Sequence, residues 1–157
     1  LALNEITKRN SDVEVVFAGW DVSNYRIPFK HQNLGSVALD KLADLYAQCD
    51  MCLVISGTNL SLLPLEVMAS NSVPVCTTGA NSEWLVNDEN AVMVDTDPNA
   101  IADKVCYYFE HLDELAVIRE KGLKFARATS WEAEGEKVRR AIEEGINEDE
   151  KNISIRR

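Results

Sequence analysis

Residues 51–69 read MCLVISGTNLSLLPLEVMA, and this stretch decides the fold class. The apolar run Met51–Ile55 is short and continuous, which is typical of a strand covered on both faces. The small polar turn Ser56–Asn59 follows it, and a helix is predicted to begin at Leu60 or Ser61. A strand that leads through a tight turn into a helix indicates an α/β fold with parallel strands.

The same alternation of short apolar runs and helical patterns continues on both sides of this stretch. It predicts an α/β fold in which a Rossmann-like parallel sheet has helices on both faces. Ligands of such sheets bind at the carboxyl ends of the strands. Strands are expected at 13–18, near Asn33, at 73–77 and at 91–94, and helices at 2–9, 39–49, 98–111, 112–128 and 131–146.

The composition is that of a folded globular domain, because 46% of the 157 residues are hydrophobic and 27% are charged. Sixteen basic and 26 acidic residues give a net charge of −10. This charge repels phosphate polymers and argues against nucleic acid or an anionic membrane surface as a partner. The longest apolar run is far shorter than the roughly 20 residues that cross a bilayer, so no transmembrane segment is expected.

The domain boundaries follow from where the patterns stop. The first residue, Leu1, already lies in a helical pattern, so we expect a piece of a longer polypeptide. One domain is predicted over residues 1–146, and residues 147–157 are expected to form a tail.

The cysteines Cys49 and Cys52 form a CxxC pair, a spacing found in redox and zinc sites. The sequence holds no second pair of this kind and no nearby histidine that would complete four ligands. The four cysteines are therefore predicted to be reduced core residues, and no metal site is expected.

The turn after the 51–55 strand is a candidate anion site, because the first N–H groups of a helix and its dipole attract negative charge. Ser61 is the expected N-cap of that helix. A well-capped helix that binds nothing has the same pattern, so both interpretations stay open from these residues alone. Glu66 is equally open, either as a solvated carboxylate or as the acceptor of two hydrogen bonds from a vicinal diol such as ribose.

This stretch resembles the carboxyl-terminal, nucleotide-sugar-binding half of the GT-B retaining glycosyltransferases, glycosyl transferases group 1 (family 4). Their signature has two glutamates separated by seven residues, then Met-Ala, a glycine and a Pro-Val strand, matched here by Glu66–Ala69, Asn71 and Val73–Val75. Asn71 replaces the glycine and is expected in a left-handed turn, which asparagine tolerates. Similarity to the rhamnosyltransferase branch extends over residues 17–21, 27–29, 42–46 and 49–50, and Ser130-Trp131 is a further shared feature.

The resemblance implies a hexosyltransferase-type enzyme (EC 2.4) of polysaccharide or glycan biosynthesis. Its donor would be a nucleoside-diphosphate sugar, dTDP-rhamnose in that branch, with no metal ion or other cofactor. The second glutamate, which holds the ribose, maps to Glu66, and the first, which contacts the donor sugar, maps to Thr58; these are the expected catalytic positions. The other expected donor-binding residues are Trp20, Ser36 and Val37 near the base, and Asn59, Leu60, Ser61 and Leu62 at the diphosphate.

The resemblance also implies partners beyond this chain. The glycan acceptor would be bound by an N-terminal domain, and an Arg and a Lys on an earlier strand would grip the diphosphate. This chain alone is therefore expected to bind donor weakly and to transfer nothing. We expect a cytoplasmic protein, and we expect the full-length enzyme to associate with the inner membrane as a peripheral protein. The alternative is a non-catalytic nucleotide-binding or assembly module with the same half-fold, which Thr58 favours because it replaces a carboxylate.

Overall fold

The computed structural model describes the backbone of residues 1–155 and the side chains of residues 1–146. It divides into two compact units, Leu1–Ala126 and Arg127–Arg157, which are described separately. Within the described residues, no helix combines the length and the apolar character needed to cross a membrane.

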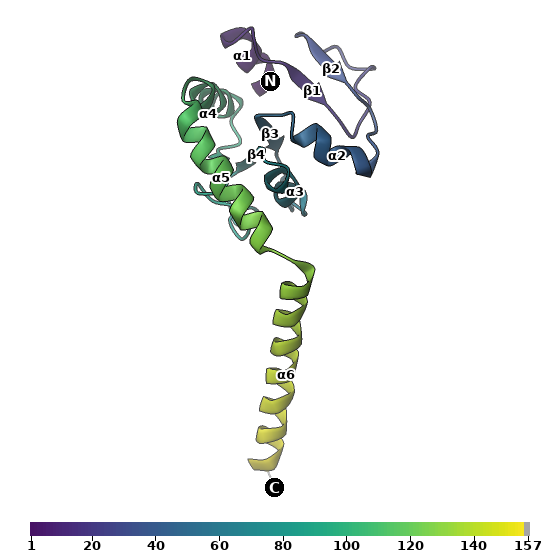
Figure 1. The fold of residues 1–157 in the computed structure, drawn as a ribbon, viewed down its shortest axis with the longest axis vertical. Coiled ribbons are helices and arrows are strands. Elements are labelled where there is room, and N and C mark those ends of the chain that lie inside the picture. The colour runs from purple at the N-terminus through teal and green to yellow at the C-terminus, as the bar shows by residue number, and fades with distance from the viewer. Residues whose placement is uncertain (156–157) are drawn as a thin grey trace. The chain divides into compact units, whose positions relative to one another are not determined.

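The first unit alternates helices and short strands, as the sequence predicts (Figure 1). Its first helix, α1 (Ala2–Arg9), packs against α4, and Arg9 forms an ion pair with Asp103 of that helix. The elements in chain order are α1 (Ala2–Arg9), β1 (Val15–Phe17), β2 (His31–Asn33), α2 (Leu39–Tyr46), β3 (Met51–Val54), α3 (Leu63–Ala69), β4 (Val73–Thr77), β5 (Val92–Val94), α4 (Pro98–Glu110) and α5 (Leu112–Ala128).

All five strands pair in parallel, but they form two sheets and not the single sheet that was expected. One sheet has the order β1-β2, with Val15 opposite His31. The other has the order β3-β4-β5, with Cys76 of β4 paired between Val54 of β3 and Met93 of β5. Because the strands of each sheet are parallel, their carboxyl ends and the loops that follow them lie at one edge of that sheet.

Helices cover both faces of the three-stranded sheet, which confirms the predicted layers. The strand β3 is not covered on both faces along its length as its apolar run predicts, because it lies at the edge of the sheet and Leu53 is 37% exposed. Successive side chains of a strand point to opposite faces, so Val73 and Val75 pack on one side and Cys76 on the other. Figure 1 shows α3 on one side of β3 and β4 and the pair α4 and α5 on the other. The first face is covered by Ile6, Ile101, Ala102, Val105, Leu115 and Ile118, and the second by Leu60, Val67, Met68 and Val86.

Turn and cap residues explain several element ends. Asp97 caps α4, because its carboxylate accepts hydrogen bonds from the amides of Asn99 and Ala100 at 2.9 and 3.0 Å. Asn71 has a φ of 62°, which confirms the left-handed turn expected after α3. The helix α2 ends at Tyr46, before the predicted end at Cys49.

The start of α3 differs from the prediction and matters for the site. The helix begins at Leu63, not at Leu60 or Ser61, and its N-cap is Leu62 without a side-chain cap. Ser61 is not the N-cap; it has a φ of 53°, in the left-handed region. Pro64 lies in the first turn of the helix, where its missing N–H costs nothing.

The second unit consists mainly of α6 (Trp131–Ile155), which continues past the predicted end at Ile146 into the expected tail 147–157. Once a helix has formed, each further residue adds a hydrogen bond without the cost of nucleation. A helix can therefore extend beyond the last residue of its apolar pattern. Arg156 and Arg157 lie outside the described residues.

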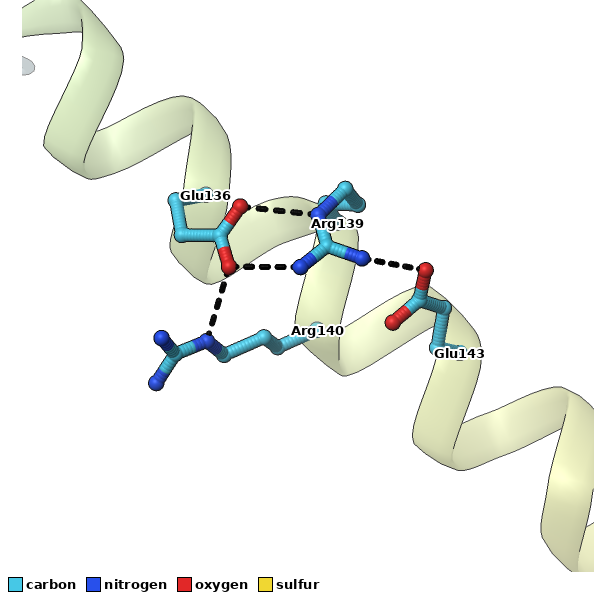
Figure 2. Close-up of polar contacts among 4 residues, drawn as sticks. All are labelled: Glu136, Arg139, Arg140 and Glu143. Atoms are coloured by element: carbon cyan, nitrogen blue, oxygen red, sulfur yellow. Dashed lines mark hydrogen bonds and ion pairs between the residues drawn. The ribbon is translucent and has the colours of Figure 1, made fainter.

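A charge ladder runs along the exposed surface of α6 (Figure 2). Glu136 pairs with Arg139 at 2.6 Å and with Arg140 at 3.0 Å, and Arg139 also pairs with Glu143. These pairs are three or four residues apart, the spacing that places side chains side by side on a helix. The hydrogen bonds from the two guanidinium groups lower the pKa of Glu136.

Candidate functional site

The candidate site lies at the carboxyl ends of the strands, where polar loops are linked in pairs. After β1 and β2, the amide of Gly19 donates to the carbonyl of Gly35 at 2.7 Å. After β3 and β4, the side-chain amide of Asn81 donates to the carbonyl of Ser56 at 2.7 Å. The structure therefore brings the 19–24 loop to Gly35, and the 56–62 loop to the loop that contains Asn81.

The loop after β3 is held by its own polar side chains. The Ser56 hydroxyl donates to the carbonyl of Asn59 at 2.7 Å and accepts from the amides of Thr58 and Asn59 at 3.3 and 3.1 Å. The Asn59 side-chain oxygen accepts from the amide of Ser61 at 2.6 Å. These local hydrogen bonds form the kind of turn that serine and asparagine favour, so the loop is preorganised before any ligand arrives.

Several backbone amides of this loop have no hydrogen-bond acceptor within the described residues, and those of Leu60 and Leu62 are among them. The Ser61 amide, by contrast, is occupied by Asn59. Leu60 is only 2% exposed and Leu62 is 44% exposed, so the first anchors the loop in the core and the second lies at the surface.

Glu66 is an exposed residue of α3, in the turn after these amides. No hydrogen bond or ion pair within the described residues involves its carboxylate. Its negative charge nevertheless acts on Tyr46, whose pKa is raised first by burial and then by Glu66. The Glu66 carboxylate is thus free to accept hydrogen bonds from a ligand.

The remaining sequence-predicted residues lie in exposed loops of the same strand ends. Thr58 is exposed in the loop after β3. Trp20 follows β1 and is 70% exposed. Ser36 and Val37 precede α2, Ser36 exposed and Val37 half-buried. No interaction in the described structure joins these three loops to one another through the predicted residues, so their shared role stays a prediction.

The structure adds polar residues that the sequence analysis missed. The Asp21 carboxylate accepts hydrogen bonds from the Ser23 hydroxyl at 2.5 Å, the Asn33 side-chain amide at 2.7 Å and the Ser23 amide at 2.9 Å. These contacts tie the loop after β1 to the end of β2. The Asp-x-Ser pattern directly after a strand is the signal that could have identified this turn.

The hydrogen bonds at Asp21 make the loop sensitive to acid. Led by the Ser23 hydroxyl, they lower the pKa of Asp21 from 3.8 to about 2. A lowered pKa stabilises the folded state above the unfolded value of 3.8, and the stabilisation is lost as the pH falls through about 2. We therefore expect the NMR shift of the Ser23 amide to titrate with a midpoint near pH 2.

The Asp21→Asn variant should abolish this titration, and Asp44→Asn, at an exposed position of α2, should leave it unchanged. A midpoint near pH 4 in the unmodified protein would contradict the prediction.

The described residues hold no cluster of three or more His, Cys, Asp or Glu side chains that could bind a metal ion. The cysteines are only partly the core residues expected. Cys76 is fully buried, whereas Cys49, Cys52 and Cys106 are half-buried.

Comparison with known proteins supports the fold. The chain is 28% identical over 134 residues to the O-antigen biosynthesis protein RfbC of Myxococcus xanthus, which covers 83% of this chain and 10% of that protein. The sucrose-phosphate synthase of Thermosynechococcus elongatus superposes with a TM-score of 0.75 at 15% identity, over 93% of this chain and 42% of that one. Anabaena Alr3699/HepE, solved in complex with UDP, gives a TM-score of 0.54 at 18% identity, over 61% and 27%.

The chain thus spans about a tenth of the curated relative and less than half of each of these two solved structures. The family model described as glycosyl transferases group 1 matches residues 2–111, which include every strand and the whole 56–66 segment. The expected relationship is confirmed: this chain is a GT-B-like α/β domain that belongs to the glycosyl transferases group 1.

Proposed function

We propose that this domain binds the nucleoside-diphosphate-sugar donor of a glycosyltransferase that builds a glycan or polysaccharide. The observation that carries the proposal is the segment after β3. Its amides without an acceptor in the described residues include that of Leu62, at the surface, and that of Leu60, in the buried part of the loop, and the free carboxylate of Glu66 lies one helical turn further on. Amides suit a diphosphate and a carboxylate suits the ribose diol, so one short segment can hold both parts of a nucleotide.

The reaction in this proposal breaks the bond between the sugar and the diphosphate and joins the sugar to an acceptor hydroxyl, which loses its proton. Positive charge develops on the sugar and negative charge on the leaving diphosphate. The amides of Leu60 and Leu62 stabilise that negative charge, and the preorganised loop lowers the cost of aligning them. Thr58 contacts the donor sugar through its hydroxyl, and Glu66 holds the ribose in place.

The finer identity of the substrates belongs to the same proposal. The resemblance to the rhamnosyltransferase branch favours rhamnose, carried by a dTDP donor, as the sugar. The same resemblance implies a transfer reaction that needs no metal ion. Trp20, Ser36 and Val37 contact the base, and Asn59 and Ser61 complete the diphosphate loop. The acceptor is a glycan, bound by an N-terminal domain outside this chain. The full-length enzyme works in the cytoplasm or at the inner membrane. The name of the M. xanthus relative supports a role in polysaccharide synthesis.

Titration of the protein with dTDP, UDP and GDP, followed by amide NMR, tests the proposal. UDP is included because HepE was solved with it. We expect one nucleotide to bind best and to shift the amides of Leu60 and Leu62. Failure of all three nucleotides to bind a folded protein would contradict donor binding.

A second candidate is a non-catalytic binding or assembly module, because Thr58 cannot supply the negative charge of a carboxylate. It predicts nucleotide binding without turnover in a longer protein that contains this chain. Detection of sugar transfer by that protein, lost when Glu66 is replaced, would exclude it.

A further inference from the structure

The loop after β4 carries an exposed tryptophan that is tied to the candidate donor site. The indole N–H of Trp84 donates to the carbonyl of Asn81 at 3.0 Å, and the Asn81 side-chain amide donates in turn to the carbonyl of Ser56 at 2.7 Å. The Ser56 hydroxyl accepts from the amide of Thr58 at 3.3 Å. Hydrogen bonds therefore connect Trp84, residue by residue, to Thr58, the position proposed to contact the donor sugar.

The turn that precedes Trp84 is fixed by its own hydrogen bonds. The carbonyl of Gly79 accepts from the amides of Ser82 and Glu83 at 2.9 and 3.0 Å, and the Gly79 amide donates to the Glu83 carboxylate at 2.9 Å. Gly79 has a φ of 125°, which residues with a side chain rarely adopt, and Ser82 is fully buried. Because this backbone is fixed, the hydrogen bond to Asn81 holds the indole at a defined place.

The ring of Trp84 presents an open apolar surface. Trp84 is 62% exposed, although burial of so large an apolar side chain is favourable. Among the described side chains, no other ring and no cation stacks on it. Its N–H, the polar part of the indole, is already satisfied by Asn81. What remains available is a flat apolar face, which suits the apolar face of a ligand.

The connection to the 56–62 loop indicates which part of a donor meets this surface. In the proposed complex, Glu66 holds the ribose and the loop amides hold the diphosphate. The sugar is attached to the far side of the diphosphate, near Thr58. The hydrogen bonds tie Trp84 to Ser56 and Thr58, at this end of the segment, and not to Glu66. One face of a sugar ring can present mainly C–H groups, which pack closely on an aromatic ring.

We propose that Trp84 is the stacking surface for the sugar of the nucleotide-sugar donor, and that it favours donors whose sugar presents an apolar face. Because the ligand is the donor, this role rests on the function proposed above, to which it adds a residue outside the 58–66 segment. A nucleoside diphosphate that lacks the sugar does not reach the indole. A 6-deoxy sugar such as rhamnose fits the surface, because a methyl group replaces one of its hydroxymethyl groups.

Calorimetric titration with two pairs of ligands, dTDP with dTDP-rhamnose and UDP with UDP-glucose, tests this role. For the pair that binds more tightly, Trp84→Ala should weaken binding of the nucleotide sugar about tenfold and that of the nucleotide less than about twofold. Trp84→Phe, which keeps an aromatic ring, should restore most of the affinity. The matched control is Trp131→Ala, at a 79% exposed tryptophan of α6, and should change neither affinity.

Saturation-transfer NMR detects the contact directly. Saturation of the aromatic protons of the protein should transfer to the C–H protons of the bound sugar. The transfer should persist in Trp131→Ala and should be lost in Trp84→Ala.

The titrations separate the failure of this role from the failure of donor binding. Unchanged binding of both ligands by a folded Trp84→Ala variant would overturn the role of the indole and leave donor binding intact. Equal weakening of both ligands would also overturn it, because the indole would then contact the nucleotide and not the sugar. If the unmodified protein binds neither nucleotide nor nucleotide sugar, the donor function itself fails, and the role of Trp84 fails with it.

Discussion

Glu66→Gln is expected to weaken nucleoside-diphosphate binding about 10- to 150-fold. The variant keeps the size and shape of the side chain but removes the charge that strengthens its hydrogen bonds to a ribose diol. Hydrogen bonds to charged groups contribute about 1.5–3 kcal/mol, which corresponds to this range of affinities. Calorimetric or NMR titration with the best-binding nucleotide measures the effect.

The control for this experiment is Glu120→Gln. Glu120 is an exposed carboxylate of α5, outside the 56–66 segment, and its replacement changes the net charge by the same amount. We expect it to change the affinity by less than a factor of two. Equal weakening by both variants would mean that general charge, and not a ribose contact, explains the loss, and would remove Glu66 from the site.

Leu60→Ala is expected to lower the free energy of unfolding by about 2–5 kcal/mol, the usual cost of truncating a fully buried leucine. Leu60 is 2% exposed and packs in the core cluster on the α3 side of the sheet. It is also the only residue of the 56–62 loop in that cluster, within the described chain, so its side chain fixes the loop to the domain. Urea unfolding followed by circular dichroism measures the change.

Leu62→Ala is the matched control, because Leu62 is the same residue type in the same loop but is 44% exposed. Substitutions at exposed positions usually change stability by no more than about 0.5 kcal/mol. Similar destabilisation by the two variants would contradict the anchoring role of Leu60.

The sequence predicted the order of helices and strands well because the decisive patterns are local. The continuous apolar run of β4 (Val73–Thr77) is buried along its whole length, as such runs require. The helix Pro98–Glu110 begins where proline and the Asp97 cap place it. The layers followed from the same patterns, because apolar residues alternate between the two faces of the three-stranded sheet.

Two features could not be predicted in this way. The start of α3 was predicted too early because serine is a common N-cap residue. In the structure the Ser61 amide donates to the Asn59 side chain, and the helix begins two residues later, at Leu63. The position of Pro64 in the first turn was the signal for a later start. The division into two sheets depends on contacts between distant segments, on which local periodicity carries no information. The motif located the candidate segment 58–66 along the chain. It could not predict the side-chain hydrogen bonds that decide which amides of this segment have no acceptor.

Because the strands form two separate sheets, the two parts of the fold differ in local stability. The β1-β2 pair has three residues in each strand, and two-stranded pairs are only marginally stable by themselves. The three-stranded sheet is buried between helices on both faces. In the donor complex proposed above, Trp20 and Ser36 belong to loops of the weaker sheet and Leu60 and Glu66 to the stronger. Such a ligand spends part of its binding free energy on suppressing local opening of β1 and β2, and it makes the two sheets open as one cooperative unit.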